Sequence, residues 1–267
     1  PPFFRDSRIK AKVRNYYFSR NNNPFRSFET WAMGGGVRYR SGWAFDRFRL
    51  GATLYTSQKP YGPEDKGGSL LLKPVQQSFT VPGEAFIDLK LYGNTFFRGY
   101  RQTFDYPYIN RQDNLMVPNT FEAYVVRHEP HTDLDWIVGQ VSRIKLRFED
   151  EFIPMSQAAS LEDSDKGLTM AGFRYNINQH DNFGGVNYYS WDVMNTFYTE
   201  GNILWQATEE IPVKVSAQLT KQDSVGKALD GDFDTFSFGG QIAASYQGAI
   251  LTLAATSTGN DSRIRSP

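Results

Sequence analysis

The stretch Arg8-Ile9-Lys10-Ala11-Lys12-Val13-Arg14 places a basic residue at every second position and an apolar residue at each position between. Because successive side chains of a β-strand point to opposite faces, this segment, when extended, has one cationic face and one apolar face. A row of like charges on one strand requires water, counter-ions or an anionic ligand beside it. The apolar face requires apolar surroundings. A membrane-spanning β-barrel, with lipid outside and a wet lumen inside, supplies both.

The composition excludes several kinds of site. The chain has 267 residues, of which 29 are basic and 29 acidic, so any effect of charge depends on placement, and we expect no nucleic-acid partner. Cysteine is absent, which excludes thiolate metal sites and disulfides. Aromatic residues make up 15% while the mean hydropathy is −0.52. This combination is typical of barrels with aromatic girdles, although soluble β-rich proteins also show it.

Two segment types that often identify a membrane or exported protein are missing from the sequence. No apolar run approaches the roughly 20 residues of a membrane helix. The chain opens with Pro1-Pro2-Phe3 and shows no signal peptide. A mature exported product would look like this, and so would a cytoplasmic protein.

Two-residue alternation recurs along the chain and predicts about thirteen strands. They span residues 6–20, 30–40, 45–56, 84–92, 95–103, 119–128, 134–147, 167–176, 183–192, 197–207, 212–221, 234–246 and 249–258. Long polar connections alternate with short ones; the long ones are 57–83, 104–118, 148–166 and 222–233, and the short ones include 40–42, 92–94 and 247–248. Long loops at one end and tight turns at the other are typical of outer-membrane barrels. We therefore predict an all-β fold, a transmembrane antiparallel β-barrel that crosses the membrane many times.

Three predicted strands show the two faces most clearly. Their apolar faces carry Phe48, Leu50, Ala52 and Leu54, then Trp136, Val138, Ile144 and Leu146, then Phe236, Phe238, Ile242, Ala244 and Tyr246. The opposite faces carry cations or small and polar residues: Arg47, Arg49, Thr53, Arg143, Lys145, Arg147, Thr235, Ser237, Gly239, Gln241 and Ala243. Small inward residues leave a lumen open, whereas a packed sandwich core would contain large ones. The pattern predicts an open pore.

Several segments, taken in their order along the chain, resemble the OprD-type substrate-specific outer-membrane porins. They are Asn15–Asn21, Gly99–Thr103, Asn110–Asn114, Val117–Phe121, Ile144–Arg147 with Glu151 and Phe152, Gly231–Thr235, and Asn260–Ser262 followed by Ser266 and Pro267. The resemblance implies an eighteen-stranded monomeric barrel in the outer membrane of a Gram-negative bacterium, in contact with lipid and lipopolysaccharide. It implies passive diffusion of small, mostly carboxylate-bearing nutrients, with no enzymatic activity and no cofactor. An inward-folded loop narrows such pores, and a basic ladder guides the substrate past acidic and tyrosine groups.

The chain departs from this family pattern at its C-terminal end. About thirteen predicted strands are fewer than eighteen, and no C-terminal strand with a final aromatic residue is present. Unpaired strand edges cannot face hydrocarbon, because their N–H and C=O groups would be unsatisfied. We therefore expect residues 1–267 to be a single, incomplete barrel domain from which the last strands are missing.

The cations on the predicted lumen face are candidates for a substrate-binding ladder. A carboxylate about 4 Å from a cation gains ~1 kcal/mol in water and ~4 kcal/mol at an effective dielectric constant near 20. Several such sites, spaced along a strand, attract an anion without trapping it, which conduction requires. The alternative is that some of these cations are solvated rim charges that contact lipopolysaccharide or neighbouring acids. The candidates are Arg8, Lys10, Lys12, Arg14, Arg38, Arg47, Arg49, Arg98, Arg143, Lys145 and Arg147.

The connection near 104–118 is the candidate constriction loop. Pro107 and Pro118 stiffen it, and its tip carries hydroxyl, amide and charged groups. We expect Asp113 to face the ladder, and Tyr106, Tyr108 and Arg111 to shape the gap. The alternative is an ordinary extracellular loop in which Asp113 pairs with Arg111.

Other functions have less support in the sequence. A general or oligosaccharide-selective porin would depend on aromatic lumen residues such as Tyr55 and Tyr124, and a soluble carbohydrate-binding β-sandwich would use exposed Trp and Tyr. Catalytic and metal sites are not expected, because His128, His131 and His180 fall in predicted turns and no serine lies in a Gly-x-Ser-x-Gly elbow. The acid clusters 149–151 and 162–165 match no calcium loop.

Overall fold

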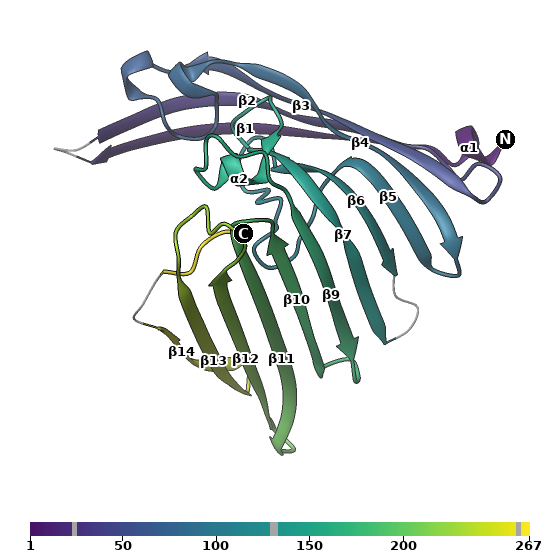
Figure 1. Cartoon of the computed structure of the whole chain (residues 1–267), viewed down its shortest axis with the longest axis vertical. Helices are drawn as coiled ribbons and strands as arrows, with labels where there is room; N and C mark the ends of the chain where they lie inside the picture. Colours follow the sequence, from purple (N-terminus) through teal and green to yellow (C-terminus); the bar gives the residue numbers. More distant parts are fainter. Residues whose placement is uncertain (23–25, 129–132, 260–262) are drawn as a thin grey trace. The chain divides into compact units, whose positions relative to one another are not determined.

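A computed structural model describes residues 1–22, 26–128, 133–259 and 263–267 (Figure 1). Almost all regular structure in these residues is β-strand. The strands are β1 (Arg8–Asn22), β2 (Arg26–Arg40), β3 (Phe48–Tyr61), β4 (Phe79–Tyr92), β5 (Thr95–Gln102), β6 (Thr120–His128), β7 (Leu134–Lys145), β8 (Ile153–Pro154), β9 (Leu168–Asn176), β10 (Asn182–Ser190), β11 (Met194–Thr208), β12 (Ile211–Ser224), β13 (Asp234–Tyr246) and β14 (Ala249–Thr258). The helices are short: α1 (Pro2–Arg5), α2 (Met155–Ala158), η1 (Glu64–Lys66) and η2 (Pro74–Gln76). Within the described part of the chain, no helix is long and apolar enough to cross a membrane.

All thirteen predicted strands are confirmed, and the two-residue β8 is an addition. Several boundaries differ from the prediction; β2, for example, begins four residues earlier, at Arg26. β3 begins at Phe48 because Phe45 and Asp46 both have a φ of 53°, which belongs to a turn. β3 and β4 extend further into the predicted loop 57–83, and β7 ends at Lys145.

The strands pair antiparallel and follow one another in chain order, β1-β2-β3-β4-β5-β6-β7-β9-β10-β11-β12-β13-β14, with β8 pairing only with β7. This order means that successive connections lie at alternate ends of the strands. The connections 62–78, 103–119, 146–152 and 225–233 fall on one end, and the two-residue turns 93–94 and 247–248 on the other. The predicted alternation of long and short connections is confirmed in part: the predicted short turn 40–42 is the seven-residue connection 41–47, and the connection 191–193 at the end of the long loops has only three residues.

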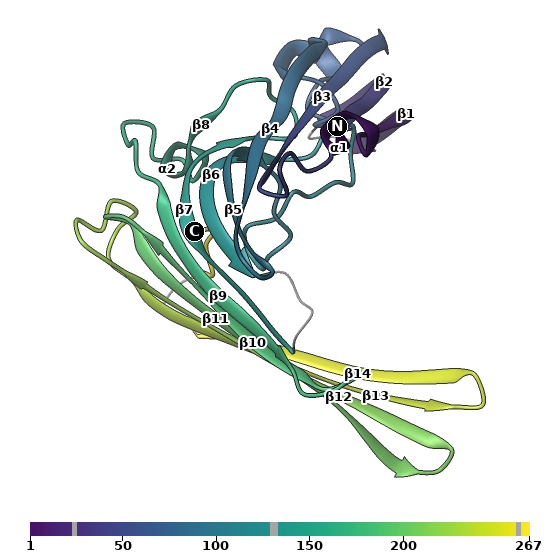
Figure 2. The same cartoon turned by 90° about the vertical axis from the view of Figure 1, so that its right-hand side faces the viewer.

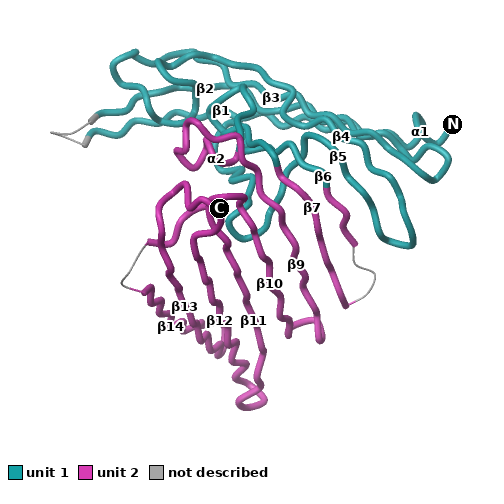
Figure 3. Tube along the Cα trace, in the orientation of Figure 1, with its two compact units in different colours: residues 1–124, 142–154 teal, residues 125–141, 155–267 magenta. Residues whose placement is uncertain are grey.

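The chain divides into two compact units (Figure 3). The first contains residues 1–124 and 142–154, which hold β1–β5, the start of β6 and the end of β7. The second contains residues 125–141 and 155–267, in which β9–β14 run as successive neighbours (Figure 2). Each unit is described separately below.

In both units one face of the sheet exposes large apolar side chains. In the first unit Ile9 and Val13 of β1 are 73% and 83% exposed. In the second unit the exposed residues include Phe236, Phe238, Ile242 and Tyr246 of β13, as the alternation predicts. Apolar side chains exposed together in this way mark a surface that contacts a membrane or a partner. Ile144 differs from the prediction, because it is buried where β8 pairs with β7.

The opposite face of the first unit carries a small apolar core formed by two loops. Leu71 and Leu72 of the connection 62–78 and Met116 and Val117 of the connection 103–119 pack in one buried cluster. Strand residues complete it: Ala32, Tyr55, Phe79 and Val81. Because long connections normally run over the surface, this packing shows that both loops fold back onto the sheet of their own unit.

Candidate functional site

The site begins with the cationic face of β1. Lys12 lies opposite Gly36 of β2, and Arg14 lies opposite Gly34. Neither glycine borders open space: a Cβ at Gly36 would lie 2.8 Å from the Tyr55 ring, and one at Gly34 would lie 2.1 Å from the Thr56 carbonyl oxygen, so β3 packs closely against β2 at these positions. Between them, Gly35 has a φ of 126°, and a Cβ there would lie 1.9 Å from the Lys12 carbonyl oxygen, so only glycine fits.

The connection between β5 and β6, residues 103–119, is a folded element rather than an open loop. Phe104, Ile109, Met116 and Val117 are each at most 5% exposed. Its backbone closes on itself, since the Asn119 N–H donates to the Arg111 carbonyl at 2.7 Å. This packing fixes the direction in which the loop presents its polar tip.

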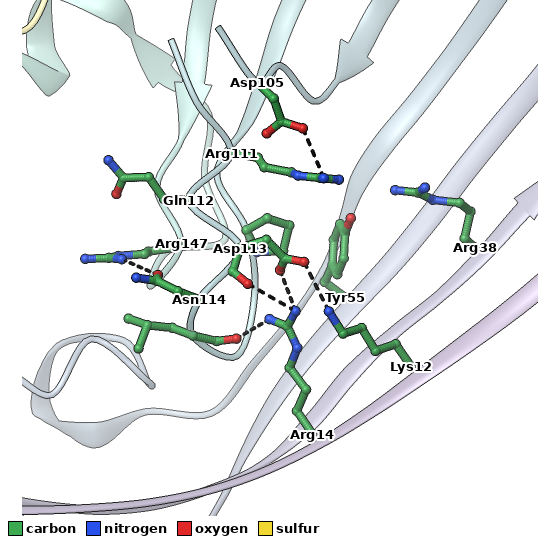
Figure 4. A network of polar contacts seen from close by, with 12 residues as sticks. Lys12, Arg14, Arg38, Tyr55, Asp105, Arg111, Gln112, Asp113, Asn114 and Arg147 are labelled. Carbon is green, nitrogen blue, oxygen red and sulfur yellow. Dashed lines mark hydrogen bonds and ion pairs between the residues drawn. The ribbon is translucent and has the colours of Figure 1, made fainter. Parts of the chain in front are cut away.

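The tip of this loop contacts the cationic face of β1 (Figure 4). The Arg14 guanidinium donates to Asp113 Oδ1 at 2.6 Å and also to the Leu115 carbonyl oxygen. Lys12 Nζ lies 3.2 Å from Asp113 Oδ2. Arg14 is only 14% exposed at this contact whereas Lys12 is 62% exposed, so the Arg14 pair is the stronger of the two.

A cavity of about 400 Å³ lies between the loop and the sheet. Its described lining carries five basic side chains and a single carboxylate, that of Asp113. The cavity therefore has an excess of positive charge. Its lining residues are Lys10, Ala11, Lys12, Arg14, Gly35, Gly36, Arg38, Thr53, Tyr55, Arg111, Asp113, Met116 and Pro118.

Arg38 is held in place at one side of this cavity by a buried acid. Its guanidinium donates to Glu84 Oε1 at 2.6 Å, and the Tyr55 hydroxyl donates to the same oxygen at 2.6 Å. The Glu84 side chain is 4% exposed, while Arg38 is 43% exposed. One side of the Arg38 guanidinium is thus fixed, and the rest faces the cavity.

Three of the sequence-predicted cations have structural partners away from the cavity. Arg49 and Arg98 both bind the Asp88 carboxylate, at 2.7 and 2.5 Å, and Asp88 is 1% exposed. The Arg98 guanidinium also lies over the Phe86 ring, at 3.9 Å. Arg143 lies 3.9 Å from Glu122 and is half exposed.

The other predicted cations differ in how they are bound. Arg8, Lys10 and Arg47 make no side-chain hydrogen bond or ion pair with any described residue. Arg147 donates to Asn114 Oδ1 at 2.8 Å. Lys145 is fully buried, so the structure does not bring it to the group that lines the cavity.

The four predicted constriction residues separate into two pairs. Asp113 and Arg111 line the cavity, and Arg111 pairs with Asp105 at 3.0 Å rather than with Asp113. Tyr106 and Tyr108 are half buried within the loop and are absent from the cavity lining. Tyr106 packs near Phe104, with ring centroids 6.2 Å apart.

The residues of the oligosaccharide alternative do not form a shared site. Tyr55 lines the cavity but is buried, with its hydroxyl bound to Glu84. Tyr124 is 54% exposed and stacks on Phe97 with ring centroids 6.5 Å apart. The cavity lining does not include Tyr124.

Sequence reasoning missed the acids that hold the cations. Glu84 and Asp88 stand at positions of β4 that pair with Thr53 and Arg49 of β3. A known register would have placed Asp88 opposite Arg49, but register was not available from alternation alone. The amides Asn114 and Asn119 were missed as well, because nothing in their sequence context distinguishes a ligand of Arg147 from a solvated loop residue.

No group of His, Asp and Glu side chains in the described residues is arranged to hold a metal ion. His128 ends β6 and stacks on Trp136. His180 lies in the turn between β9 and β10. His131 and the segment 260–262 lie outside the described residues.

Asp113 gives the site a testable pH dependence. Burial opposes its ionisation, but hydrogen bonds from Arg14 and Lys12 outweigh burial, so the pKa of Asp113 lies below its ordinary value of 3.8. A carboxyl whose pKa is depressed by folding stabilises the folded state at pH values above its ordinary pKa. This stabilisation is lost as the pH falls through the pKa that the group has in the folded state. We expect the loop to stay docked from neutral pH to about pH 5 and to be released only below the ordinary Asp pKa.

Single-channel conductance in planar bilayers, measured against pH, checks this expectation. The change in conductance on acidification should be absent in Asp113→Asn, because this variant has no carboxyl to protonate at position 113. A change between neutral pH and about pH 5 that this substitution removes would contradict the depressed pKa.

Comparisons with known proteins give a family match over nearly the whole chain. The model described as "outer membrane porin, OprD family" matches residues 1–265. No curated protein sequence matches significantly.

Solved structures of similar fold are porins. OccK9 (OpdG) of Pseudomonas aeruginosa superposes with a TM-score of 0.81 at 21% identity, covering 97% of this chain and 70% of that one. OpdK of Pseudomonas aeruginosa, solved with vanillate, superposes with a TM-score of 0.83 at 20% identity, covering 99% of this chain and 70% of that one. OccK2 (OpdF) of Pseudomonas aeruginosa, in complex with glucuronate, superposes with a TM-score of 0.79 at 17% identity, covering 99% of this chain and 68% of that one.

Proposed function

The chain belongs to the OprD family of outer membrane porins, and on this premise we propose that it admits small carboxylate-bearing solutes by passive diffusion past the cations of β1 and β2. Members of the family are channels of the bacterial outer membrane with a β-barrel fold, and they are not enzymes. The predictions of a transmembrane β-barrel and of a substrate-specific channel are confirmed. The alternative of a soluble β-sandwich was wrong, since the family match identifies a porin.

The observation that carries the proposal is the charge of the cavity beneath the loop 103–119. Five cations line this cavity with a single carboxylate, that of Asp113. Arg38 and Arg111 have their own acids outside the lining, Glu84 and Asp105, which leaves Lys10, Lys12 and Arg14 with Asp113. Lys12 and Arg14 are only partly neutralised, because they share Asp113. An incoming carboxylate would complete the charge balance, and a cation would be repelled.

We assign the loop 103–119 the role of the constriction. The substrate carboxylate would compete with Asp113 for Lys12 and Arg14. These two cations would therefore attract the substrate less strongly at the narrowest point. Conduction favours such an arrangement, because a site must bind strongly enough to admit the solute and weakly enough to release it. The Arg14 guanidinium can also hold a carboxylate through two parallel hydrogen bonds, which would orient the solute.

The remaining ladder would run along the first two strands. Arg8 lies opposite Arg40 and Lys10 opposite Arg38 in the register of β1 and β2. The basic residues of the two strands therefore lie side by side on one face of the sheet, where both rows would attract a passing anion. Neighbours solved with vanillate and glucuronate, both carboxylates, support this substrate class.

We extend the proposal to the surroundings of the barrel. The exposed apolar face of β1, β13 and β14 would contact the hydrocarbon of the outer membrane, with lipopolysaccharide at its outer rim. We expect the working form to be a monomer, as the resemblance to OprD-type porins implies.

Ion selectivity and carboxylate block test the proposed function. In planar bilayers under a KCl gradient, the reversal potential should show that chloride is preferred over potassium. Benzoate or gluconate added on the side of the long loops should reduce the chloride current at millimolar concentration, which corresponds to roughly −4 kcal/mol of binding.

The control solute is benzamide, which has the shape of benzoate but carries no charge. It should not block the current. A channel that prefers potassium, or that benzamide and benzoate block equally, would overturn carboxylate guidance and favour a general or oligosaccharide-selective porin.

A further inference from the structure

Lys145 at the end of β7 has surroundings unlike those of any ladder cation. It is 0% exposed, and its ammonium donates to two backbone carbonyls, those of Pro118 at 3.0 Å and Leu146 at 2.9 Å. No carboxylate of the described residues lies within ion-pair distance of Lys145. Full burial of an ammonium is costly unless its N–H groups are bound, so these two hydrogen bonds must be important to the local structure.

One of the two carbonyls belongs to the end of the loop 103–119. Pro118 directly precedes Asn119, whose N–H closes the loop by donating to the Arg111 carbonyl. The Asn119 side chain in turn accepts the Arg147 backbone N–H at 2.8 Å. Lys145 and Arg147 therefore both fasten the same two residues at the end of the loop to the end of β7.

The same short segment also reaches the tip of the loop. The Arg147 guanidinium donates to Asn114 Oδ1 at 2.8 Å, next to Asp113 (Figure 4). On its other side the tip is held by Arg14 and Lys12 of β1. The loop is thus tied at two sides, by exchangeable ion pairs on β1 and by the buried Lys145 with Arg147 at the end of β7.

From this geometry we infer that Lys145 is a positioning residue of the channel, which holds the constriction loop in place from β7 and does not itself guide anions. Its charge is enclosed and bound by carbonyls, so a passing solute cannot reach it. Its loss would leave the Pro118 and Leu146 carbonyls unsatisfied and free the end of the loop. The inference rests on the proposed function, because it takes the loop 103–119 to be the constriction.

The test compares Lys145→Met with Arg143→Met in single-channel recordings. The two residues stand two positions apart on the same face of β7, but Arg143 is 52% exposed and Lys145 is buried. In Lys145→Met we expect several-fold larger open-channel current noise and about tenfold weaker block by benzoate, with the reversal potential unchanged. In Arg143→Met we expect a small shift of the reversal potential toward potassium, with the noise of the unsubstituted protein.

Lys145→Gln is the second variant, used also if Lys145→Met fails to assemble. It keeps an N–H donor for the carbonyls but removes the charge. Its current noise should therefore lie between that of Lys145→Met and that of the unsubstituted protein. A shift in reversal potential without added noise, in either Lys145 variant, would show that Lys145 is a ladder cation and would overturn the inference. Unchanged noise and unchanged block would overturn it as well.

The unsubstituted protein separates failure of this inference from failure of the proposed function. If it shows no chloride preference and no benzoate block, the proposed function fails. If it shows both and the Lys145 variants behave like it, only the role of Lys145 fails.

Discussion

Substitution of Arg14 by glutamate is expected to reduce carboxylate permeation by about ten- to a hundredfold, the largest functional effect of any single change at the site. Arg14 donates to the Asp113 carboxylate, to the Asp113 backbone and to the Leu115 carbonyl. A glutamate there would remove all of these contacts. It would also place a negative charge beside Asp113 and so repel both the loop tip and an incoming carboxylate.

The magnitude follows from the change of two charge units at a partly buried position. A unit pair at about 4 Å gains between ~1 kcal/mol in water and ~4 kcal/mol at an effective dielectric constant near 20. Screening and rearrangement of the loop bring the net loss to about 1–3 kcal/mol, and each 1.4 kcal/mol corresponds to a factor of ten. Liposome uptake of radiolabelled benzoate, or single-channel block, measures this loss.

Arg8→Glu is the matched control for this experiment. It makes the same charge change on the same face of the same strand, six residues and thus about 20 Å from Arg14. Because Arg8 makes no side-chain hydrogen bond or ion pair with any described residue, its substitution should lower permeation only a few-fold and leave the current noise unchanged. Equal effects of the two substitutions would show that net charge matters and docking of the loop does not.

Substitution of Asp88 by asparagine is expected to cost about 3–5 kcal/mol of folding stability, the largest structural effect we predict. Asp88 is 1% exposed and binds two arginines whose side chains are 12% and 11% exposed, Arg49 and Arg98. Asparagine has nearly the same shape but no charge. Two guanidinium groups would then be left close together and uncompensated away from water.

Urea unfolding in lipid vesicles, followed by tryptophan fluorescence, measures the effect. Asp46→Asn is the matched control, because Asp46 also pairs with a cation, Lys90 at 3.0 Å, but is 78% exposed. Exposed pairs contribute about 0–1 kcal/mol, so this variant should unfold nearly as the unsubstituted protein does. If the two variants unfold alike, the buried cluster does not stabilise the sheet.

The strands were predictable because their signal is local. Alternation places Ile9 and Val13 on one face and Lys10 and Lys12 on the other, whatever the rest of the chain does. The start of β3 was less predictable, since the left-handed conformations of Phe45 and Asp46 leave no mark in a pattern of hydrophobicity.

The site was predictable only in part, because solvation of a strand face depends on what folds over it. Alternation puts Arg143 and Lys145 on one face, yet the first is half exposed and the second is sealed against Pro118. Likewise the pairing of Arg49 with Asp88 depends on the register of β3 against β4. That Asp113 faces the cations was expected from the loop, but its choice of Lys12 and Arg14 over Arg111 depends on contacts between residues distant in sequence.

The docking of Asp113 on Arg14 has a consequence for the order of assembly. The two residues are 99 positions apart, and their contact closes a loop that contains β2, β3, β4 and β5. Bringing together two residues so far apart in the chain costs conformational entropy before their contact can compensate for it. This cost is smaller once the intervening hairpins have brought the two residues close to each other. We therefore expect the intervening hairpins to form first, and the loop 103–119, the constriction in the proposed function, to dock in a late folding step.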